Sequence, residues 1–507
     1  MLLIILTSIL GFALLFLAFL RHRFSYWKNR GFPSTSPCTP LGDFAGVGIK
    51  MHYHVKYAQL YNAFKKKTKF FGAFLYMKPT LFITDLDLLR TVLVKDFHYF
   101  EDRGVYYNEK EDPLTAHIFA IEGEKWRKMR NNLSPTFTSG KMKYMFHTIS
   151  DKGQVLIDYI DKHFAKTGAV MEGKDVAQRF TADVIGSCAF GVEVHAFDTT
   201  KVPEIIKIAK GIFSDSAFGG MYFFLVSSYQ SLARFLKLRL IAKYVEDYFM
   251  TMIKENVEYR ETNCVVRADF FNMLLNLKNR GTIFEDKPEN EEGKITFKEL
   301  AAESAVFFFA GFETSSSTMN FALYLLASHP EVQEKVRAEV RRVKALHDNK
   351  ISYEALMEMK YLTQVFDETL RMYPPVGNLS RNTIRDYKIP DTDLVVPQGT
   401  MISITVYGIH NDPDIYPEPE KFDPDRFTPE EVAKRHPYAY IPFGKGPRDC
   451  IGNRFGMLQV KFGLATILDN FKVEVNPKTI QPIVRELKTR NVAAKGGLWF
   501  NITRLED

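Results

Sequence analysis

The sequence predicts a mainly helical protein with a smaller β region and a single N-terminal membrane helix. Long segments repeat apolar residues at the three- and four-residue spacing of amphipathic helices, whereas alternation of apolar and polar residues is confined to short segments. The first 20 residues carry no charged side chain and are long enough to cross a bilayer. Hydrophobic residues make up 46% of the 507-residue chain, which is ample for a large core.

Residues 1–20 form the predicted membrane anchor. Arginine and lysine residues follow between positions 21 and 30, and by the positive-inside tendency the bulk of the chain stays in the cytoplasm. A cleaved signal peptide is the alternative, but a basic n-region and a small-residue cleavage site are both missing. Three prolines then interrupt any helix, so residues 21–40 indicate a basic, proline-rich linker and residues 41–507 one large domain.

Charge and cysteine usage exclude two classes of protein. A net charge of +7 is modest for this length and does not indicate nucleic-acid binding. The four cysteines, Cys38, Cys188, Cys264 and Cys450, show no close pairing. A secreted disulfide framework is therefore not expected, and a reducing compartment fits better.

Periodicity and capping signals place the elements in order along the chain. Asp85 is an expected N-cap, and Thr296 with Glu299 has the spacing of a capping box. The expected helices are 53–68, 85–95, 125–132, 141–167, 176–190, 296–328, 331–346, 356–373 and 453–470. Alternation predicts a hairpin over 70–84 around Lys78-Pro79, and short strands within 376–405, including 387–389 and 394–396, and at 499–503.

Three segments have less regular patterns. Residues 99–123 have no clean period and indicate a long functional loop. Residues 211–241 are rich in Phe and Tyr and end with basic residues, so they form either a membrane-dipping element or an ordinary buried helix pair. Residues 278–294 are polar and predict a mobile surface loop.

The helix expected at 296–328 carries Ala310-Gly-Phe-Glu-Thr-Ser315 in its middle. Gly311 and the hydroxyl residues after it are poor helix formers, so they should loosen the helix and open a groove. The acid Glu313 beside the alcohol Thr314 can then support a chain of water molecules. The alternative is a simple helix kink with Glu313 solvated or paired.

The stretch from Phe443 to Gly452 places one cysteine, Cys450, among glycines and cationic residues. Gly446 and Gly452 should let the backbone turn and approach a flat ligand closely. A helix is expected directly after the sulfur, and a helix N-terminus favours a thiolate over a thiol. A thiolate can serve as a nucleophile, a redox centre or a metal ligand, whereas a structural cysteine in a glycine-rich loop is the alternative.

The spacing of Phe443, Gly446, Arg448, Cys450 and Gly452 resembles the haem-ligand signature of the cytochrome P-450 family. Other landmarks occur in the family's order, namely Trp126 with Arg130, the Ala310–Thr314 string, Glu368 with Arg371 before Tyr373-Pro-Pro375, and Arg426. The resemblance implies the cytochrome P-450 fold, mainly α with a smaller β region. Haem b would lie between the long central helix and the Cys450 loop, with residues 41–507 as the haem-binding monooxygenase domain.

The resemblance also implies residue roles. Cys450 would be the axial thiolate ligand of the haem iron, and Thr314 and Glu313 would be the catalytic pair that holds water or dioxygen and relays protons. The other implied haem contacts are Trp126, Arg130, Ala310, Arg381, Phe443, Arg448 and Gly452. Glu368, Arg371 and Arg426 would form a buried structural triad. Taken alone, the Trp126 and Glu368 motifs also occur on ordinary helices with a packed ring or a solvated ion pair.

The implied reaction inserts one atom of O2 into a lipophilic small molecule. Gly46-Val-Gly48 is not a complete Gly-x-Gly-x-x-Gly unit, so NADPH would act through a partner, NADPH–cytochrome P-450 reductase. Cytochrome b5 is a candidate second donor. The expected cationic docking face, for which solvation alone is the alternative, comprises Lys125, Arg127, Lys128 and Lys445. Family members with this N-terminus lie in the endoplasmic-reticulum membrane, single-pass, with the catalytic domain on the cytoplasmic face.

The loop at 101–121 most resembles insect microsomal members of family six, which oxidise plant toxins and insecticides. The resemblance rests on Asp102-Arg-Gly104, Asn108-Glu-Lys110 and Asp112-Pro-Leu-Thr115. It implies xenobiotic substrates, with endogenous lipids or hormones as the alternative. The expected substrate-lining residues, each with core packing as the alternative, are Ile118, Phe119, Phe307, Phe308, Ala310, Val376, Asn378 and Leu379.

Three rival functions fit parts of the pattern. A haem-thiolate isomerase or dehydratase of peroxides needs no external electrons, and the intact Glu313–Thr314 pair argues against it. A non-catalytic haem protein would bind or sense a small ligand behind a blocked distal pocket. A membrane-anchored structural protein would bind no haem and would show no Soret absorption.

Overall fold

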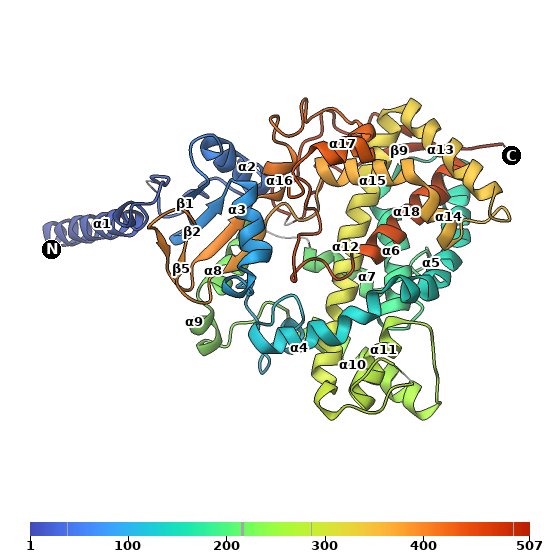
Figure 1. Cartoon of the computed structure of the whole chain (residues 1–507), viewed down its shortest axis with the longest axis horizontal. Coiled ribbons are helices and arrows are strands. Elements are labelled where there is room, and N and C mark those ends of the chain that lie inside the picture. The colour runs from blue at the N-terminus through green and yellow to red at the C-terminus, as the bar shows by residue number, and fades with distance from the viewer. Residues whose placement is uncertain (38, 214–216, 285, 490, 507) are drawn as a thin grey trace. The chain divides into compact units, whose positions relative to one another are not determined.

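The structure is a computed structural model that describes all residues except 38, 214–216, 285, 490 and 507. Cys38, part of the aromatic 211–241 segment and part of the 278–294 loop therefore lie outside the described residues. The chain divides into two compact units. Unit 1 comprises residues 1–104, 377–417 and 436–449, and unit 2 comprises residues 105–376, 418–435 and 450–507. The predicted fold class, mainly helical with small sheets, is confirmed (Figure 1).

Unit 1 contains most of the β structure. Its elements are α1 (Leu2–Phe24), α2 (Tyr53–Phe64), β1 (Phe70–Leu75), β2 (Lys78–Ile83), α3 (Leu86–Arg90), β4 (Leu379–Asn382), β5 (Tyr387–Lys388), β6 (Val395–Val396), β7 (Met401–Ile404) and α16 (Val406–His410). The main sheet has the order β1-β2-β7-β4, in which β2 and β7 are parallel and the other neighbours are antiparallel. β5 and β6 form a separate pair.

The hairpin of β1 and β2 forms as predicted but turns earlier than predicted. Leu75 pairs with Lys78, so Tyr76 and Met77 make the turn, and Tyr76 takes a φ of 52°. The expectation of a turn at Lys78-Pro79 was wrong because Pro79 is tolerated inside β2. Pairing of β2 with β7 begins only at Thr80, so no proline amide is required on that side.

Within the described residues one helix, α1, is long and apolar enough to cross a membrane by length and composition. It continues to Phe24, beyond the expected end at residue 20. Arg21, His22 and Arg23 lie in its last turn. Cationic side chains are favourable there because the C-terminal end of a helix carries partial negative charge.

The segment directly after α1 packs on the sheet of unit 1. Trp27 is fully buried, and its indole N–H donates to the carbonyl oxygen of Ala73 in β1 at 3.2 Å. A Cβ on Gly72 would lie 2.2 Å from the Trp27 ring, so glycine is required under the indole. Thr35 N donates to Gly72 O at 3.0 Å. The base of α1 is therefore held to β1.

Unit 2 is helical around one long central helix, α12. Its elements are α4 (Gly123–Leu133), α5 (Ser139–Ile160), β3 (Met171–Glu172), α6 (Gly173–Ala189), α7 (Glu204–Phe213), α8 (Ala217–Ser228), α9 (Gln230–Phe235), α10 (Lys243–Thr262), α11 (Phe270–Arg280), α12 (Phe297–Ser328), α13 (Pro330–Ala345), α14 (Tyr353–Glu358), α15 (Lys360–Met372), α17 (Pro429–Lys434), α18 (Asn453–Asn470), β8 (Phe471–Val475) and β9 (Trp499–Arg504). α12 packs against α6, α15 and α18 (Figure 1). The three strands form a sheet in the order β3-β9-β8.

The predicted capping box at the start of α12 is confirmed. Thr296 Oγ1 accepts a hydrogen bond from Glu299 N, and the Glu299 carboxylate accepts one from Thr296 N. Two of the amides that a helix N-terminus leaves unpaired are thereby satisfied. α18 is also confirmed, because it begins and ends at the predicted residues.

The single helix expected at 356–373 is instead two helices, α14 and α15. Met359 lies between them with a φ of −75° and a ψ of 81°, which is not helical. The Glu339 carboxylate on α13 accepts hydrogen bonds from Tyr361 N and Leu362 N, both at 2.9 Å. A side chain from another helix thus caps α15, and periodicity within 356–373 could not reveal it.

A buried ionic network joins α15 to the segment 418–427. Glu368 and Arg371 are both fully buried, and the guanidinium donates to both carboxylate oxygens at 2.7 and 2.8 Å. Arg426 Nε lies 3.6 Å from Glu368 Oε1, which also accepts from Asp423 N at 3.0 Å. Arg371 Nη2 donates to Lys421 O at 3.3 Å. The structure therefore brings the three predicted triad residues together, and two of them hold backbone groups of this segment.

We expect Glu368→Ala to lower the free energy of unfolding by about 3–5 kcal/mol, because the change leaves Arg371 as a buried cation without its carboxylate. Urea unfolding of the detergent-solubilised protein measures the effect. Glu358→Ala is the control, since Glu358 is 54% exposed where it pairs with His347. That surface pair should contribute no more than about 1 kcal/mol. Equal losses in the two variants would contradict a stabilising role for the buried network.

Candidate functional site

Cys450 is exposed and lies three residues before Asn453, the first residue of α18. The thiol is thus at the N-terminal end of an 18-residue helix, as the sequence predicts. Gly452 is the N-cap and has a φ of −89°, and a Cβ there would meet no described atom within 4 Å. The backbone conformation therefore does not itself require glycine at this position, and the close approach of Gly452 to a flat ligand stays a prediction.

Gly446 does have the predicted special conformation. Its φ is +81°, and a Cβ there would lie 2.2 Å from the carbonyl oxygen of Leu93. Both the left-handed backbone and the close approach require glycine. Gly444 also has a positive φ, of 73°, and Phe443 beside it is half-buried. The loop before the cysteine is thus shaped by glycine at two positions within unit 1.

Arg448 fastens this loop to the segment 101–103 of unit 1. Its guanidinium is almost fully buried, and Nε donates to Glu101 O at 2.7 Å. Asp102 Oδ1 lies 3.6 Å from Arg448 Nη2. In return, Arg103 Nη2 donates to Arg448 O at 2.7 Å. The backbone and the side chain of Arg448 are therefore both held by one short segment.

Arg381 on β4 is a buried cation with few partners. Only 2% of the residue is exposed. Nη1 donates to Ser380 O at 2.8 Å, whereas Nε has no hydrogen-bond partner among the described residues. Burial lowers the pKa of Arg381 to about 10. A buried guanidinium in this state would gain strongly from an anionic group that supplies the missing acceptor.

Trp126 and Arg130 lie one turn apart on α4, as predicted. Trp126 is buried and Arg130 is half-buried. Their neighbour Lys125 forms ion pairs with Glu109 at 2.8 Å and Glu299 at 3.3 Å. The Lys125 ammonium group is therefore already paired with carboxylates of unit 2, which makes it less suitable for the expected docking face. Lys128 is exposed.

The middle of α12 carries the predicted hydroxyl bonds to the backbone. Thr314 Oγ1 donates to Ala310 O at 2.6 Å, and Thr318 Oγ1 donates to Thr314 O at 2.9 Å. α12 nevertheless remains helical from end to end, so the predicted groove stays a prediction. A Cβ on Gly311 would lie 2.9 Å from the Ile185 side chain of α6. Close packing of α12 on α6 is thus the structural reason for glycine at this position.

Glu313 is turned toward α6 rather than toward Thr314. Its Oε1 lies 2.9 Å from Lys174 Nζ, and its Oε2 accepts from Gln178 Nε2 at 3.3 Å. The same ammonium group donates to Ser317 Oγ at 2.5 Å. In the structure Glu313 is therefore paired with side chains of α6. To support a water chain with Thr314, its carboxylate would have to leave these partners.

The expected substrate-lining residues on α12 differ in their surroundings. Ala310 is exposed, although most of the helix is buried. Phe307 packs on Phe270 with ring centroids 4.2 Å apart. Phe308 is fully buried against Phe190 and Phe249, so the core-packing alternative holds for it.

The other expected lining residues lie in both units. In unit 2, Ile118 is buried, Phe119 is 47% exposed and Val376 is 41% exposed. In unit 1, Asn378 Oδ1 accepts from Ser403 Oγ at 2.8 Å, and Leu379 packs on the core of that unit. Sequence reasoning missed Glu303 of α12, a fully buried acid that accepts a hydrogen bond from Ile118 N at 2.7 Å. Its helical spacing from Phe307 and Ala310 was the available signal.

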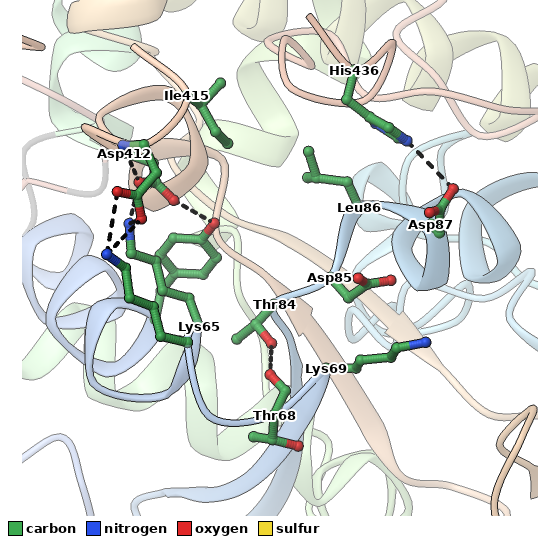
Figure 2. A pocket seen from close by; sticks show the side chains of 13 residues that line it. Lys65, Thr68, Lys69, Thr84, Asp85, Leu86, Asp87, Asp412, Ile415 and His436 are labelled. Atoms are coloured by element: carbon green, nitrogen blue, oxygen red, sulfur yellow. Dashed lines mark hydrogen bonds and ion pairs between the residues drawn. The ribbon is translucent and has the colours of Figure 1, made fainter. Parts of the chain in front are cut away.

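A surface cavity of about 550 Å³ lies in unit 1, and its lining includes none of these residues (Figure 2). Asp412 accepts from Tyr61 Oη at 2.9 Å and also pairs with Lys65. Asp414 pairs with Lys65 at 3.0 Å and with Lys66 at 3.2 Å. These charges satisfy one another and tie α2 to the turn after α16, so they have a structural role.

Considered one by one, the side chains fit a haem with two anionic propionates. Cys450 offers an exposed thiol at a helix start, and Ala310 offers a small exposed side chain on a helix that is otherwise mostly buried. Within the described part of the chain, the buried Arg381 Nε–H has no acceptor, and a propionate would supply one. Trp126 and Arg130 add an indole donor and a guanidinium on one helix face.

Comparisons with known proteins identify the family. The family model described as cytochrome P450 matches residues 36–495. "Probable cytochrome P450 6a14" of Drosophila melanogaster is 41% identical over 95% of this chain and 96% of its own length. "Cytochrome P450 6A1" of Musca domestica is 42% identical over 97% of this chain and 96% of its own length. "Cytochrome P450 6a2" of Drosophila melanogaster is 40% identical over 96% of this chain and 97% of its own length. The chain therefore belongs to the cytochrome P450 family and is a P450 monooxygenase, an oxidoreductase, of the insect family-six group.

Proposed function

We propose that this monooxygenase inserts one atom of O2 into lipophilic small molecules, with plant toxins and insecticides as the foremost class. The observation that carries the proposal is the exposed Cys450 thiol at the start of α18, inside the segment matched by the family model. The similarity to insect family-six proteins supports the substrate class. Endogenous lipids or hormones are the alternative substrates.

The bound haem would supply the activation of O2, in which two electrons and two protons convert the second oxygen atom to water while the first enters the substrate. Cys450 would hold the haem as a thiolate. Arg381, whose Nε lacks an acceptor, would bind a propionate, and Trp126 and Arg130 would donate to the other. Arg448 would add charge at the haem edge while it holds its own loop to the segment 101–103.

Two residues of α12 would handle protons on the substrate side. The Thr314 hydroxyl donates to Ala310 O, so its lone pairs are available to accept from a water molecule or another donor. Glu313 would bring protons from the Lys174 and Gln178 side of the helix. Release of Glu313 from Lys174 would then be a step in proton delivery.

Electrons would come from NADPH through NADPH–cytochrome P-450 reductase, with cytochrome b5 as a candidate second donor. Three of the four cations expected to contact an acidic partner are exposed, namely Arg127 and Lys128 on α4 and Lys445 in unit 1. The net reaction consumes one NADPH, one proton and one O2 per hydroxylated product and releases NADP⁺ and water.

The protein would be anchored in the endoplasmic-reticulum membrane by α1, with the catalytic part on the cytoplasmic face. The aromatic region after α7 would add an interfacial contact. Its large apolar or aromatic side chains that remain exposed are Tyr222, Leu225, Tyr229, Leu232, Phe235 and Leu236. Such a set of exposed apolar groups favours membrane contact over the alternative of an ordinary buried helix pair.

We expect the reduced, carbon-monoxide-bound protein to show the red-shifted Soret band of thiolate-ligated haem, and Cys450→Ala to lose it. Cys264→Ala is the matched control because Cys264 is also exposed. Difference spectra of microsomes measure the band, and NADPH-dependent oxidation with added reductase tests the reaction. A band that persists in Cys450→Ala would overturn the ligand assignment, and turnover of peroxides without NADPH would favour the isomerase alternative.

Arg381→Leu should reduce haem retention about 10- to 100-fold, because a hydrogen bond to a charged group contributes about 1.5–3 kcal/mol. The haem-to-protein ratio after dilution measures it. Arg385→Leu, four residues along the chain and exposed, is the control and should retain haem normally. Full haem retention by Arg381→Leu would show that this arginine does not bind a propionate.

A further inference from the structure

Glu303 is a buried acid with an unusual environment. It is 0% exposed, and Oε1 accepts a hydrogen bond from the backbone N–H of Ile118 at 2.7 Å. Oε2 has no hydrogen-bond partner among the described residues. A leucine or methionine would fill the same space without a buried polar group, so the amide contact is the distinctive contribution of this carboxyl group.

Glu303 lies on the same helical stripe as the residues expected beside the substrate. Phe307 is four residues after Glu303, Ala310 is three residues after Phe307, and Thr314 is four residues after Ala310. Successive steps of three or four residues keep side chains on one face of a helix. Ala310 is exposed on this stripe, whereas Glu303 is covered. The short helix η4 (Pro113–Thr115) of the loop packs against α12, and Ile118 follows it. The 113–121 loop therefore covers this face of α12 at Glu303, whereas the same face is exposed at Ala310.

The electrostatic surroundings favour a neutral carboxyl group. Burial, with a smaller contribution from the Glu299 carboxylate one turn away, raises the pKa of Glu303 to about 8. The Ile118 amide and Lys125 act in the opposite direction, and Lys125 is itself paired with Glu109 and Glu299. Near neutral pH the group is mainly protonated, so it holds the amide without placing a full charge inside unit 2.

We propose that Glu303 is a positioning residue that fixes the 113–121 loop to α12 and thereby sets how far a bulky substrate extends along the α12 stripe. The proposal rests on the proposed function, because only a substrate beside Ala310 and Thr314 gives the loop position a chemical consequence. Ile118 would be held in place as part of the substrate wall, and the adjacent Phe119 is 47% exposed.

Two substitutions separate the hydrogen bond from the volume of the side chain. Glu303→Leu keeps approximate size but removes the acceptor, whereas Glu303→Gln keeps the acceptor and is neutral like the protonated acid. Glu303→Met replaces the leucine variant if the branched side chain does not fold. Glu299→Gln is the control, since it removes a charge one turn away and its amide oxygen still accepts from Thr296 N.

Hydrogen exchange of the full-length holoenzyme tests the contact directly, because the Ile118 amide is the donor. We expect exchange of the peptide covering 117–121 to quicken about tenfold in Glu303→Leu, as a net hydrogen bond of about 1–1.5 kcal/mol requires. Glu303→Gln and Glu299→Gln should match the wild type. Unchanged exchange in Glu303→Leu, or quickened exchange in Glu303→Gln, would overturn the proposal.

Spectral titration with 4-phenylimidazole and with the bulkier clotrimazole tests the consequence for binding. Glu303→Leu should weaken clotrimazole binding at least about threefold relative to 4-phenylimidazole, and Glu303→Gln should restore the wild-type ratio. An unchanged ratio with quickened exchange would refute the effect on substrate fit. Absence of a thiolate Soret band in the wild type would instead refute the proposed function, while the exchange result would still decide the Glu303 contact.

Discussion

A helix that is buried along most of its length must find partners for the polar side chains it carries, and this constraint governs the central part of unit 2. α12 has 32 residues and packs against α6, α15 and α18. The Thr314 and Thr318 hydroxyl groups donate to carbonyl oxygens of the same helix. Glu313 pairs with Lys174 of α6, and Glu303 accepts from the 113–121 loop. These pairings hold in place the helix that also carries the exposed Ala310.

The same constraint acts on buried cations, with different results. Arg371 is satisfied by Glu368 within four residues of chain and by Lys421 O, so it stabilises structure. Arg448 is satisfied largely by backbone and Asp102 of the segment 101–103. Arg381 donates to Ser380 O, and no residue that the structure describes supplies an acceptor for its Nε. The buried Arg371 therefore stabilises the fold, whereas Arg381 would gain from an added anionic acceptor.

Glycine requirements divide in a similar way. Gly446 needs its positive φ and its missing side chain because Leu93 O lies where a Cβ would be, and Gly311 is needed because Ile185 packs directly on α12. Gly452 is under neither requirement. Contacts with the described residues therefore do not explain why the haem-ligand signature has glycine at position 452.

Local signals in the sequence were sufficient for the elements whose ends depend on nearby residues. The capping box at Thr296 and the helix from Asn453 to Asn470 follow from side chains within a few positions of each end. The apolar composition predicted the N-terminal helix but not its end at Phe24. The spacing around Cys450 was sufficient to identify the family. Only the tertiary structure decided the break at Met359, because Glu339 of another helix caps α15. It also decided the partners of Glu313 and Glu303, which lie 139 and 185 residues away in the chain. A charge or amide that distant leaves no periodic trace in the sequence, so burial and pairing of these acids emerge only when the helices pack.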